Sequence, residues 1–366
     1  MNTNTILQEI VNTIRLPEVR CIAVSGHAAP DGDSIASCIA FAHLVRKATT
    51  GKTVDVFVFG DFPQRFRFLD TDSEVRIIPI YENKQYKGDG LVKLFGRYDL
   101  AVSIDTALVR QLPDNYYEHI FCKADRTIKI DHHPFMETFD KETGAMVPND
   151  FAQCNLMDDT FNSSAQIVWR LVESFGLKPS DLGTTFLEAV YTGLVTDTGT
   201  FLYAKNALAF HDAAAMIEQG IDHIETCRKI IGNIPLCFYR IRQHVQRNVK
   251  LTDDGRIAVL SEDDELKWLK SEAKSIGCKD EAAEEIIRTL CELLQVQGVE
   301  IVLKVNDTNF SVKSKRVDIS VLAMRYGGGG HSNASAFSVT RDGQTNEEIL
   351  EKIIAEYQEE LDRYFG

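Results

Sequence analysis

Short apolar runs recur along the first third of the chain, and they restrict the folds open to it. They are CIAVS (21–25), VDVFVFG (54–60), LAVSID (100–105) and TIKID (127–131). Apolar residues at helical spacing follow the first run, from Ile35 to Val45. Strands buried on both faces have nearly continuous apolar sequences, which is typical of a parallel sheet covered by helices. The pattern therefore predicts an α/β fold built on a parallel sheet.

The second half of the sequence predicts another, smaller unit. Helical periodicity dominates 163–176, 184–196 and most of 206–250. Strand and helix patterns then resume, with strands RIAVLS (256–261), VEIVLKV (299–305) and NFSVKSK (309–315) and helices near 280–295 and 346–364. We therefore predict two domains, residues 1–245 and 246–366, the second a smaller α/β domain.

Charge and composition narrow the range of partners. The 366 residues carry a net charge of −14, from 54 acidic and 40 basic side chains, without a Lys/Arg-rich tract. Proteins that grip long nucleic acids neutralise many phosphates with a basic stripe, so a long duplex or single strand is excluded as the main ligand. A short phosphorylated substrate held by a few local cations remains compatible with this charge.

The sequence also bears on location. No apolar run approaches the ~18 residues that a membrane span needs, and the N-terminus lacks the basic start and apolar centre of a secretory signal. The eight cysteines form no CxxC pair, which favours reduced core thiols over disulfides or a zinc site. We expect a cytoplasmic protein without a membrane partner.

Acidic and imidazole side chains stand where predicted elements end. Those following strands are His27, Asp31, Asp33, Asp105 and the DHH triplet 131–133, and Asp197 ends a predicted helix. In open α/β sheets, ligands bind at the carboxyl ends of the strands. These side chains are therefore expected to converge at one edge of the sheet.

Each of these residues also has a purely structural interpretation. Asp33 could cap a helix beginning at Ser34, and His132 with His133 could form a solvated turn. Asp197 fits such an interpretation less well, because a carboxylate at a helix C-terminus opposes the helix dipole at a cost of ~0.3–1 kcal/mol unless a cation offsets it.

A pair of divalent cations would explain the whole set. Converging carboxylates repel one another or raise one another's pKa unless metal ions supply positive charge. Mixed carboxylate and imidazole ligands favour Mn²⁺, Fe²⁺ or Co²⁺ over Ca²⁺ or Mg²⁺, with Mg²⁺ kept as an alternative. Two ions ~3.5–4 Å apart would generate a nucleophile and stabilise an in-line phosphoryl displacement.

Five separated motifs resemble one known family. HAAPDGDS (27–34), DTA (105–107), DHHP (131–134) and VTDTGTF (195–201) resemble, in order, the four motifs of the DHH phosphoesterase superfamily. GGGGHSNASAF (327–337) is similar to the glycine-rich signature of the DHH-associated domain, DHHA1. The resemblance spans about residues 20–340 and implies an active site in the cleft between the two domains.

The resemblance also implies roles for the motif residues. One metal ion would be held by His27, Asp31 and Asp105, and the other by Asp33, Asp105, His132 and Asp197. Asp105 would then bridge the two ions. His133 is expected to contact the scissile phosphate, while Asp131 anchors the histidine loop.

The expected substrate contacts lie in the second domain. Backbone N–H groups of Gly328, Gly329 and Gly330 could approach a ligand closely, a following helix N-terminus could receive a phosphate, and His331 could neutralise it. A flexible loop is the alternative for the glycine run alone. Lys313 and Ser314 lie in SVKS (311–314), where relatives often carry Ser-x-Arg-Ser. Lysine keeps the charge but lacks the planar fork of arginine.

Three further residues have two possible roles each. Arg325 either compensates for the missing arginine or is a solvated helix residue. Ser163 and Ser164 align with a segment near the metal cleft in relatives, although helix capping is the favoured role.

The predicted function is that of a phosphoric ester hydrolase. It resembles the oligoribonuclease (nano-RNase) branch, in which a metal-bridging hydroxide attacks the phosphate of short oligonucleotides or of 3′-phosphoadenosine 5′-phosphate. The alternatives are a cyclic or linear dinucleotide phosphodiesterase, a manganese-dependent inorganic pyrophosphatase, and a nucleotide-binding regulator without turnover. A homodimer is left open.

Overall fold

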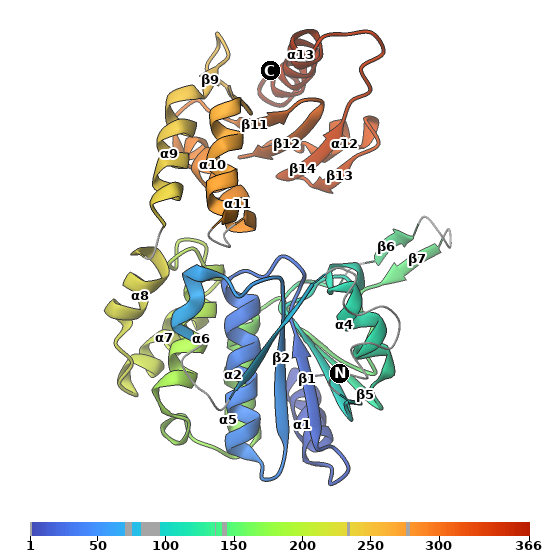
Figure 1. The fold of residues 1–366 in the computed structure, drawn as a ribbon, viewed down its shortest axis with the longest axis vertical. Helices are drawn as coiled ribbons and strands as arrows, with labels where there is room; N and C mark the ends of the chain where they lie inside the picture. The colour runs from blue at the N-terminus through green and yellow to red at the C-terminus, as the bar shows by residue number, and fades with distance from the viewer. Residues whose placement is uncertain are drawn as a thin grey trace. The chain divides into compact units, whose positions relative to one another are not determined.

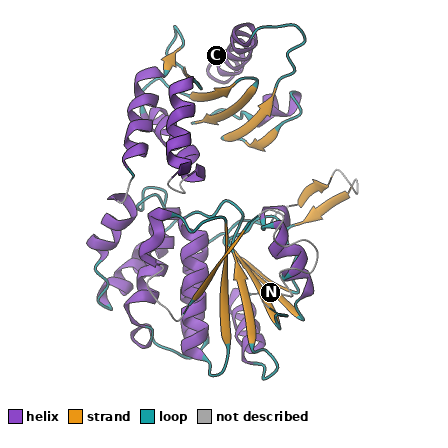
Figure 2. Ribbon diagram, in the orientation of Figure 1, coloured by secondary structure: helices purple, strands orange, loops and turns teal. Residues whose placement is uncertain are grey.

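The computed structural model describes residues 2–69, 75–81, 96–135, 137–140, 145–232, 235–275 and 279–366. The chain divides into two compact units, Met1–Asn233 and Ile234–Gly366. Helices and strands alternate along much of both units (Figure 2).

The first unit is built on a six-stranded parallel sheet, as predicted. Its strand order is β3-β2-β1-β4-β5-β8, and every neighbouring pair is parallel. The strands are β1 (Cys21–Ser25), β2 (Thr53–Phe59), β3 (Arg76–Ile80), β4 (Leu100–Ile104), β5 (Arg126–Asp131) and β8 (Cys154–Met157). The chain adds β2 and β3 on one side of β1 and then returns to place β4 on the other side. That reversal creates a topological switch point between β1 and β4, where ligands of open α/β sheets bind.

Helices cover both faces of this sheet (Figure 1). One face packs on α1 (Thr3–Arg15), α2 (Gly32–Ala48), α5 (Ser164–Ser174) and α6 (Gly183–Asp197). The other packs on α4 (Asp114–His119) and on the short 3-10 turns Val109–Gln111 and Phe121–Lys123. A hairpin of β6 (Glu137–Asp140) and β7 (Ala145–Pro148), the helices α7 (Leu208–Glu218) and α8 (His223–Gly232), and the 3-10 turns Gln64–Leu69 and Pro179–Asp181 complete the unit.

The second unit has a mixed sheet with the order β13-β14-β12-β11-β10-β9. Only β10 and β11 pair in parallel among its neighbours. The strands are β9 (Lys250–Leu251), β10 (Ile257–Ser261), β11 (Ile301–Asn306), β12 (Asn309–Ser314), β13 (Gly329–His331) and β14 (Ala334–Ser338). One core lies under α9 (Leu236–Asn248), α10 (Asp264–Ser275) and α11 (Lys279–Glu292), and the other lies under α12 (Ser320–Arg325) and α13 (Asn346–Phe365). The 3-10 turn Leu293–Gln295 follows α11.

The change between units lies earlier than the predicted residue 245, which falls inside α9. This helix packs its apolar face, including Phe238, Ile241 and Val245, against Leu260 and Leu266 of the second unit. Helical periodicity alone does not show which core a linking helix joins, so the sequence assigned α9 to the wrong side.

Two other expectations can be compared with the structure. All seven described cysteines are free thiols, but Cys21 and Cys122 are exposed and not core residues. Within the described ranges, every helix is too short or too polar to span a bilayer.

Candidate metal centre

The switch point of the first sheet carries the polar side chains expected there. His27 lies just beyond β1, and Asp105 directly follows β4. Asp31 caps α2, accepting a hydrogen bond from the Ser34 backbone N–H at 3.0 Å. Neighbouring parallel strands end at the same edge, so these side chains come together although they are far apart in sequence.

Asp105 lies between two histidines. Its Oδ2 is 3.6 Å from His27 Nε2, while its Oδ1 is 3.5 Å from His132 Nε2. His27 Nε2 also lies 3.7 Å from Asp31 Oδ2, and His132 Nε2 lies 3.3 Å from Asp197 Oδ2. These separations are long for hydrogen bonds. They match ligands that share an ion, since tetrahedral ligands ~2.1 Å from a metal are ~3.4 Å apart.

The ligand atoms form three overlapping groups, each with all its atoms within 4.8 Å of one another. The groups are His27, Asp31 and Asp105; Asp33, His132 and Asp197; and Asp105, His132 and His133. The six residues predicted as metal ligands therefore lie together in this unit. Asp105 is common to two groups, and His133 joins the third, where it was expected to contact phosphate.

The carboxylates have little positive charge near them. Asp33 is 1% exposed and Asp105 is 3% exposed. Among the residues that the structure describes, histidines are the only side chains that form ion pairs with the four carboxylates Asp31, Asp33, Asp105 and Asp197. Burial, followed by the charges of neighbouring aspartates, raises the pKa of Asp33 well above its usual range. Burial likewise raises the pKa of Asp197 to about 6 despite nearby His132. Divalent cations would remove this penalty, so the donor set fits them.

Asp33 does not cap its own helix, contrary to the interpretation favoured for it alone. Helix α2 begins at Gly32, two residues earlier than expected, so Asp31 is its N-cap. Asp33 instead accepts the backbone N–H groups of Ser164 at 2.6 Å and Ala165 at 3.0 Å. The N-terminus of α5 thus holds this buried carboxylate in place, which is a favourable position for a negative charge.

Gly193, which was not predicted as a site residue, makes room for Asp33. A Cβ atom on Gly193 of α6 would lie 2.5 Å from Asp33 Oδ1 and 2.5 Å from Ala165 Cβ. No side chain fits at that distance. A glycine inside an otherwise apolar helix was the available signal, because it costs helix stability and so points to close packing.

The backbone at Asp105 and the first turn of α5 also position the centre. Asp105 has a φ of 57°, a left-handed conformation that is uncommon outside glycine. The Ser164 hydroxyl donates to Asp105 Oδ1 at 3.2 Å. Ser163 caps α5 as predicted, accepting from the Gln166 N–H. Ser163 therefore caps the helix, whereas Ser164 contacts the candidate metal centre through Asp105.

The remaining DHH residues form a pair beside the centre. Asp131 is fully buried, and its Oδ1 lies 2.7 Å from His133 Nδ1 and accepts the His133 backbone N–H at 3.2 Å. The His133 side chain is 40% exposed. Asp131 thus contacts the histidine loop from the inside, while part of the His133 ring stays accessible.

The glycine run of the second unit differs from expectation. Gly327 has a φ of 71°, its N–H bonds to Met324 O at 3.0 Å, and the Gly328 N–H bonds to Ala323 O at 2.9 Å. These two donors terminate α12 and are not free for a ligand. A Cβ on Gly328 would lie 2.2 Å from Ala336 O, so this glycine is required by packing.

A strand begins within the run, although the sequence predicted that the N-terminus of a helix would follow it. Gly329, Gly330 and His331 form β13 and pair with Ala336, Ser335 and Ala334 of β14. Ala334, Ser335 and Ala336 of β14 are all small, so the sequence shows no alternation of apolar and polar residues here. The strands were therefore not predicted from the sequence.

The other predicted substrate contacts do not share one surface. Lys313 and Ser314 are consecutive on β12 and so point to opposite faces. Ser314 is buried, and its hydroxyl accepts the Val317 N–H at 3.0 Å. Arg325 is exposed on α12, 3.5 Å from Glu360, which agrees with a solvated helix residue. Lys313 is partly exposed and stays a predicted ligand contact.

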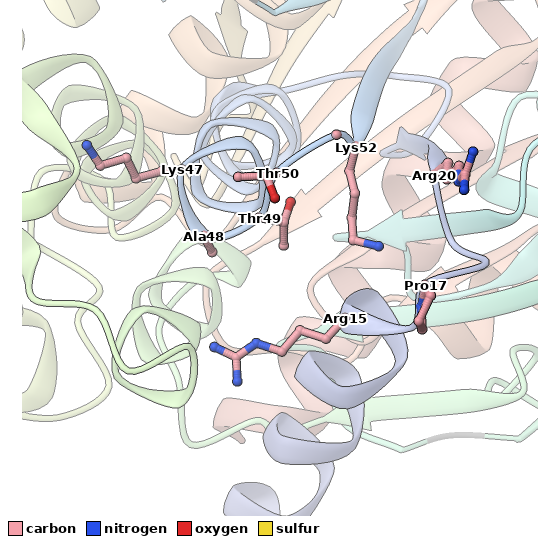
Figure 3. Close-up of a pocket in the computed structure, with 9 residues that line it drawn as sticks. Arg15, Pro17, Arg20, Lys47, Ala48, Thr49, Thr50 and Lys52 are labelled. Carbon is pink, nitrogen blue, oxygen red and sulfur yellow. The ribbon is translucent and has the colours of Figure 1, made fainter.

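A separate basic pocket lies at the amino ends of the first sheet (Figure 3). Its cationic lining residues are Arg15, Arg20, Lys47 and Lys52. Arg15 donates to Phe175 O at 2.8 Å, and Lys52 donates to Leu16 O at 2.8 Å, so both contact carbonyl groups where helices end. Helix C-termini favour cations, which accounts for this basic cluster without a ligand.

Comparison with known proteins agrees with the motifs and the geometry. Residues 21–194 match the DHH family, N-terminal domain, and residues 252–361 match the DHHA1 domain. The chain therefore carries a DHH family N-terminal domain followed by a DHHA1 domain. Together the two matches cover both units and confirm the predicted family and fold class.

Relatives of similar length carry one recurrent name. The Bacillus subtilis (strain 168) protein "Bifunctional oligoribonuclease and PAP phosphatase NrnA" is 23% identical over 90% of this chain and 92% of its own length. A Thermus thermophilus protein of the same name is 22% identical over 98% and 94% of the two chains. These relatives confirm the resemblance to the oligoribonuclease branch and support classification as a phosphoric ester hydrolase.

A solved structure shows the same fold. The crystal structure of an exopolyphosphatase-related protein from Bacteroides fragilis superposes with a TM-score of 0.76, at 22% identity and over 98% of both chains.

Proposed function

We propose that this chain is a dimetal phosphodiesterase and phosphatase that hydrolyses short oligoribonucleotides or small nucleotides such as 3′-phosphoadenosine 5′-phosphate. The observation that carries the proposal is the position of Asp105. Its two oxygens face His27 and His132, which belong to different ligand groups. One carboxylate between two ligand groups is what a bridged pair of ions requires.

The chain offers residues for both ions. His27, Asp31 and Asp105 would hold one ion, and Asp33, Asp105, His132 and Asp197 the other. Bound Mn²⁺ would lower the pKa of a water molecule and neutralise charge on the phosphate. Mixed oxygen and nitrogen ligands support Mn²⁺, with Fe²⁺, Co²⁺ and Mg²⁺ as alternatives.

The protein's own groups would position the substrate. His133, half-exposed beside the carboxylates, would donate a hydrogen bond to the scissile phosphate as negative charge develops on it. Asp131 would keep the His133 ring oriented through the Nδ1 contact at 2.7 Å. Lys313 and the β13 residues Gly329, Gly330 and His331 are the proposed substrate contacts of the DHHA1 domain. An active site that includes the cleft between the domains stays a prediction.

Short substrates agree with the charge of the chain. A net charge of −14 opposes binding of long polyanions. The relatives named NrnA are described as bifunctional oligoribonuclease and PAP phosphatase, which supports the same substrate class here.

Incubation of the full chain with Mn²⁺ tests the proposal. The substrates are labelled ribonucleotide dimers and pentamers, 3′-phosphoadenosine 5′-phosphate, cyclic dinucleotides and inorganic pyrophosphate, and Asp105→Asn is the inactive control. Release of nucleoside monophosphate from the dimers, or of phosphate from 3′-phosphoadenosine 5′-phosphate, is expected. Turnover of pyrophosphate alone, or of no substrate, would overturn it.

A further inference from the structure

Lys129 is a buried cation beneath the DHH triplet. Its side chain is 0% exposed, in the middle of β5. Its Nζ donates hydrogen bonds to Ala107 O at 3.1 Å and Asn149 O at 2.8 Å, and lies 3.2 Å from Asp131 Oδ2. The Phe151 ring covers it, with its centroid 4.8 Å from Nζ.

The position of these contacts gives Lys129 a specific relation to the candidate metal centre. Ala107 lies in the segment that begins with Asp105, and Asn149 lies just after β7. Lys129 therefore holds two loops and one carboxylate together at the carboxyl edge of the sheet. Burying an ammonium group is costly, and replacing a buried ion pair by apolar residues often leaves stability unchanged or improved. Stability alone is thus a weak reason for a lysine here.

The strand period places Lys129 and Asp131 side by side. Alternate residues of a strand share a face, so Lys129 and Asp131 lie on one face of β5. Ile128 and Ile130 pack into the core on the other face. Each oxygen of Asp131 has a different neighbour, since Oδ2 faces Lys129 and Oδ1 faces His133 Nδ1.

We propose that Lys129 is a positioning residue for His133, acting through Asp131. The ammonium group fixes the Asp131 carboxylate, and the carboxylate accepts a hydrogen bond from His133 Nδ1–H. In the imidazolium form, in which both ring nitrogens are donors, His133 Nε2–H is thereby oriented to donate to the substrate phosphate. This inference rests on the proposed function. It predicts that the lysine affects the turnover step through the aspartate and has little effect on substrate affinity.

Kinetics of Lys129→Met and Lys129→Gln with a ribonucleotide dimer and Mn²⁺ test the inference. Loss of a group that orients a catalytic side chain costs ~10–100-fold in activity. We expect kcat to fall by that factor while KM changes less than ~3-fold. Lys129→Gln keeps a donor for Ala107 O or Asn149 O, so it preserves the loops and isolates the effect of the charge. The matched control is Asp55→Asn, which disrupts another ion pair of the sheet, between buried Asp55 and the more exposed Arg76, and should leave kcat within ~2-fold.

A double-mutant cycle decides whether the lysine acts through the aspartate. Residues that act as a unit are strongly non-additive. In an Asp131→Asn background, adding Lys129→Met should change kcat less than ~3-fold. An effect of Lys129→Met that is undiminished in this background, or a wild-type kcat in both Lys129 variants, would overturn the inference.

The tautomer of His133 provides a readout independent of activity. Imidazole ¹⁵N spectra of the metal-free protein, with the His133 signal assigned by His133→Gln, should show the proton on Nδ1 in the wild type and a mixture of tautomers in Lys129→Gln. An unchanged tautomer in that variant would contradict the inference. An inactive wild type with the expected change in tautomer would refute the proposed function and leave the positioning role standing.

Discussion

The two edges of the first sheet carry opposite charges, and they differ in how far neighbouring protein groups balance those charges. At the amino edge, Arg15 and Lys52 donate to the carbonyl groups of Phe175 and Leu16, where helices end. At the carboxyl edge, Asp33 and Asp105 are buried among other carboxylates and histidines. Charges at the amino edge thus find partners within the protein, whereas those at the carboxyl edge lack sufficient positive charge.

This difference distinguishes a structural cluster from a functional one. In a parallel sheet with crossover helices, helix C-termini gather at the amino ends of the strands, and cations there stabilise the fold. Burial raises the pKa of Asp33 and Asp197 at the carboxyl edge, and the charges of neighbouring aspartates raise both further. The comparison predicts that substitutions at the carboxyl edge remove activity, and that those at the amino edge affect stability alone.

The largest effect is expected for Asp105→Asn. Losing the carboxylate between the two ligand groups should lower kcat by ~10³-fold or more, because metal ions contribute several kcal/mol to such transition states. Steady-state hydrolysis of a ribonucleotide dimer measures kcat, and elemental analysis measures bound manganese. If Asp105→Asn kept kcat and bound manganese near wild-type levels, the proposed difference between the two edges would be contradicted.

Gly193→Ala is expected to disturb the same edge indirectly. The added methyl group would lie 2.5 Å from Asp33 Oδ1, so the carboxylate must move. Displacing a ligand typically weakens metal affinity ~10–100-fold. Manganese titration by calorimetry measures this affinity. Gly232→Ala is the control, since a Cβ there contacts nothing within 4 Å, and equal affinities in both variants would count against the role of Gly193.

The pH dependence of folding stability tests the account of the carboxyl edge in a second way. Burial raises the pKa of Asp33 and Asp197, so the folded metal-free domain binds protons more tightly than the unfolded chain. Burial lowers the pKa of His27 and His133, but the neighbouring aspartates outweigh it and raise the pKa of both. All four groups therefore make the metal-free domain more stable as the pH falls from 8 to 6.

Manganese should reverse that dependence, because Mn²⁺ competes with protons for the same groups. At ~100 times Kd, binding adds ~2.7 kcal/mol, or a Tm increase of ~5–10 °C for a domain of this size. Scanning calorimetry should show this increase at pH 8 and a smaller one at pH 6. A metal-free Tm that falls between pH 8 and pH 6, or a larger manganese effect at pH 6, would contradict the electrostatic account.

The smallest effect is expected at the amino edge. Lys52→Met removes the hydrogen bond to Leu16 O and should cost ~1 kcal/mol of unfolding free energy. Denaturant unfolding measures this cost, and dimer hydrolysis should proceed with unchanged kcat and KM. A loss of activity comparable with that of the carboxyl-edge variants would mean that the basic pocket takes part in function.

Local sequence patterns were sufficient for four of the six parallel strands, β1, β2, β4 and β5, and for the residues at their ends, whereas β3 and β8 were not predicted. Apolar runs such as 21–25 and 127–131 locate buried strands, and parallel strands necessarily share an edge, so His27, Asp105 and His132 could be brought together. The partner of Asp33 could not be found in this way. Its hydrogen-bond donor at Ser164 lies 131 residues away. From the sequence alone, Asp33 could equally be the N-cap of the helix next to it.

The second domain shows a different limit. A run of four glycines has several backbone conformations open to it, and contacts elsewhere decide among them. Two of its N–H groups terminate α12, and Gly328 packs against Ala336 of β14. Residue type alone suggested a phosphate loop, whereas the tertiary contacts made the segment a helix end followed by a strand.

Anomalous scattering at the manganese absorption edge, from crystals of the full chain grown with Mn²⁺, tests the central claim most directly. The account predicts two peaks joined by the Asp105 carboxylate, one beside His27 and Asp31 and the other beside Asp33, His132 and Asp197. A single peak, no peak, or two peaks that Asp105 does not join would contradict it.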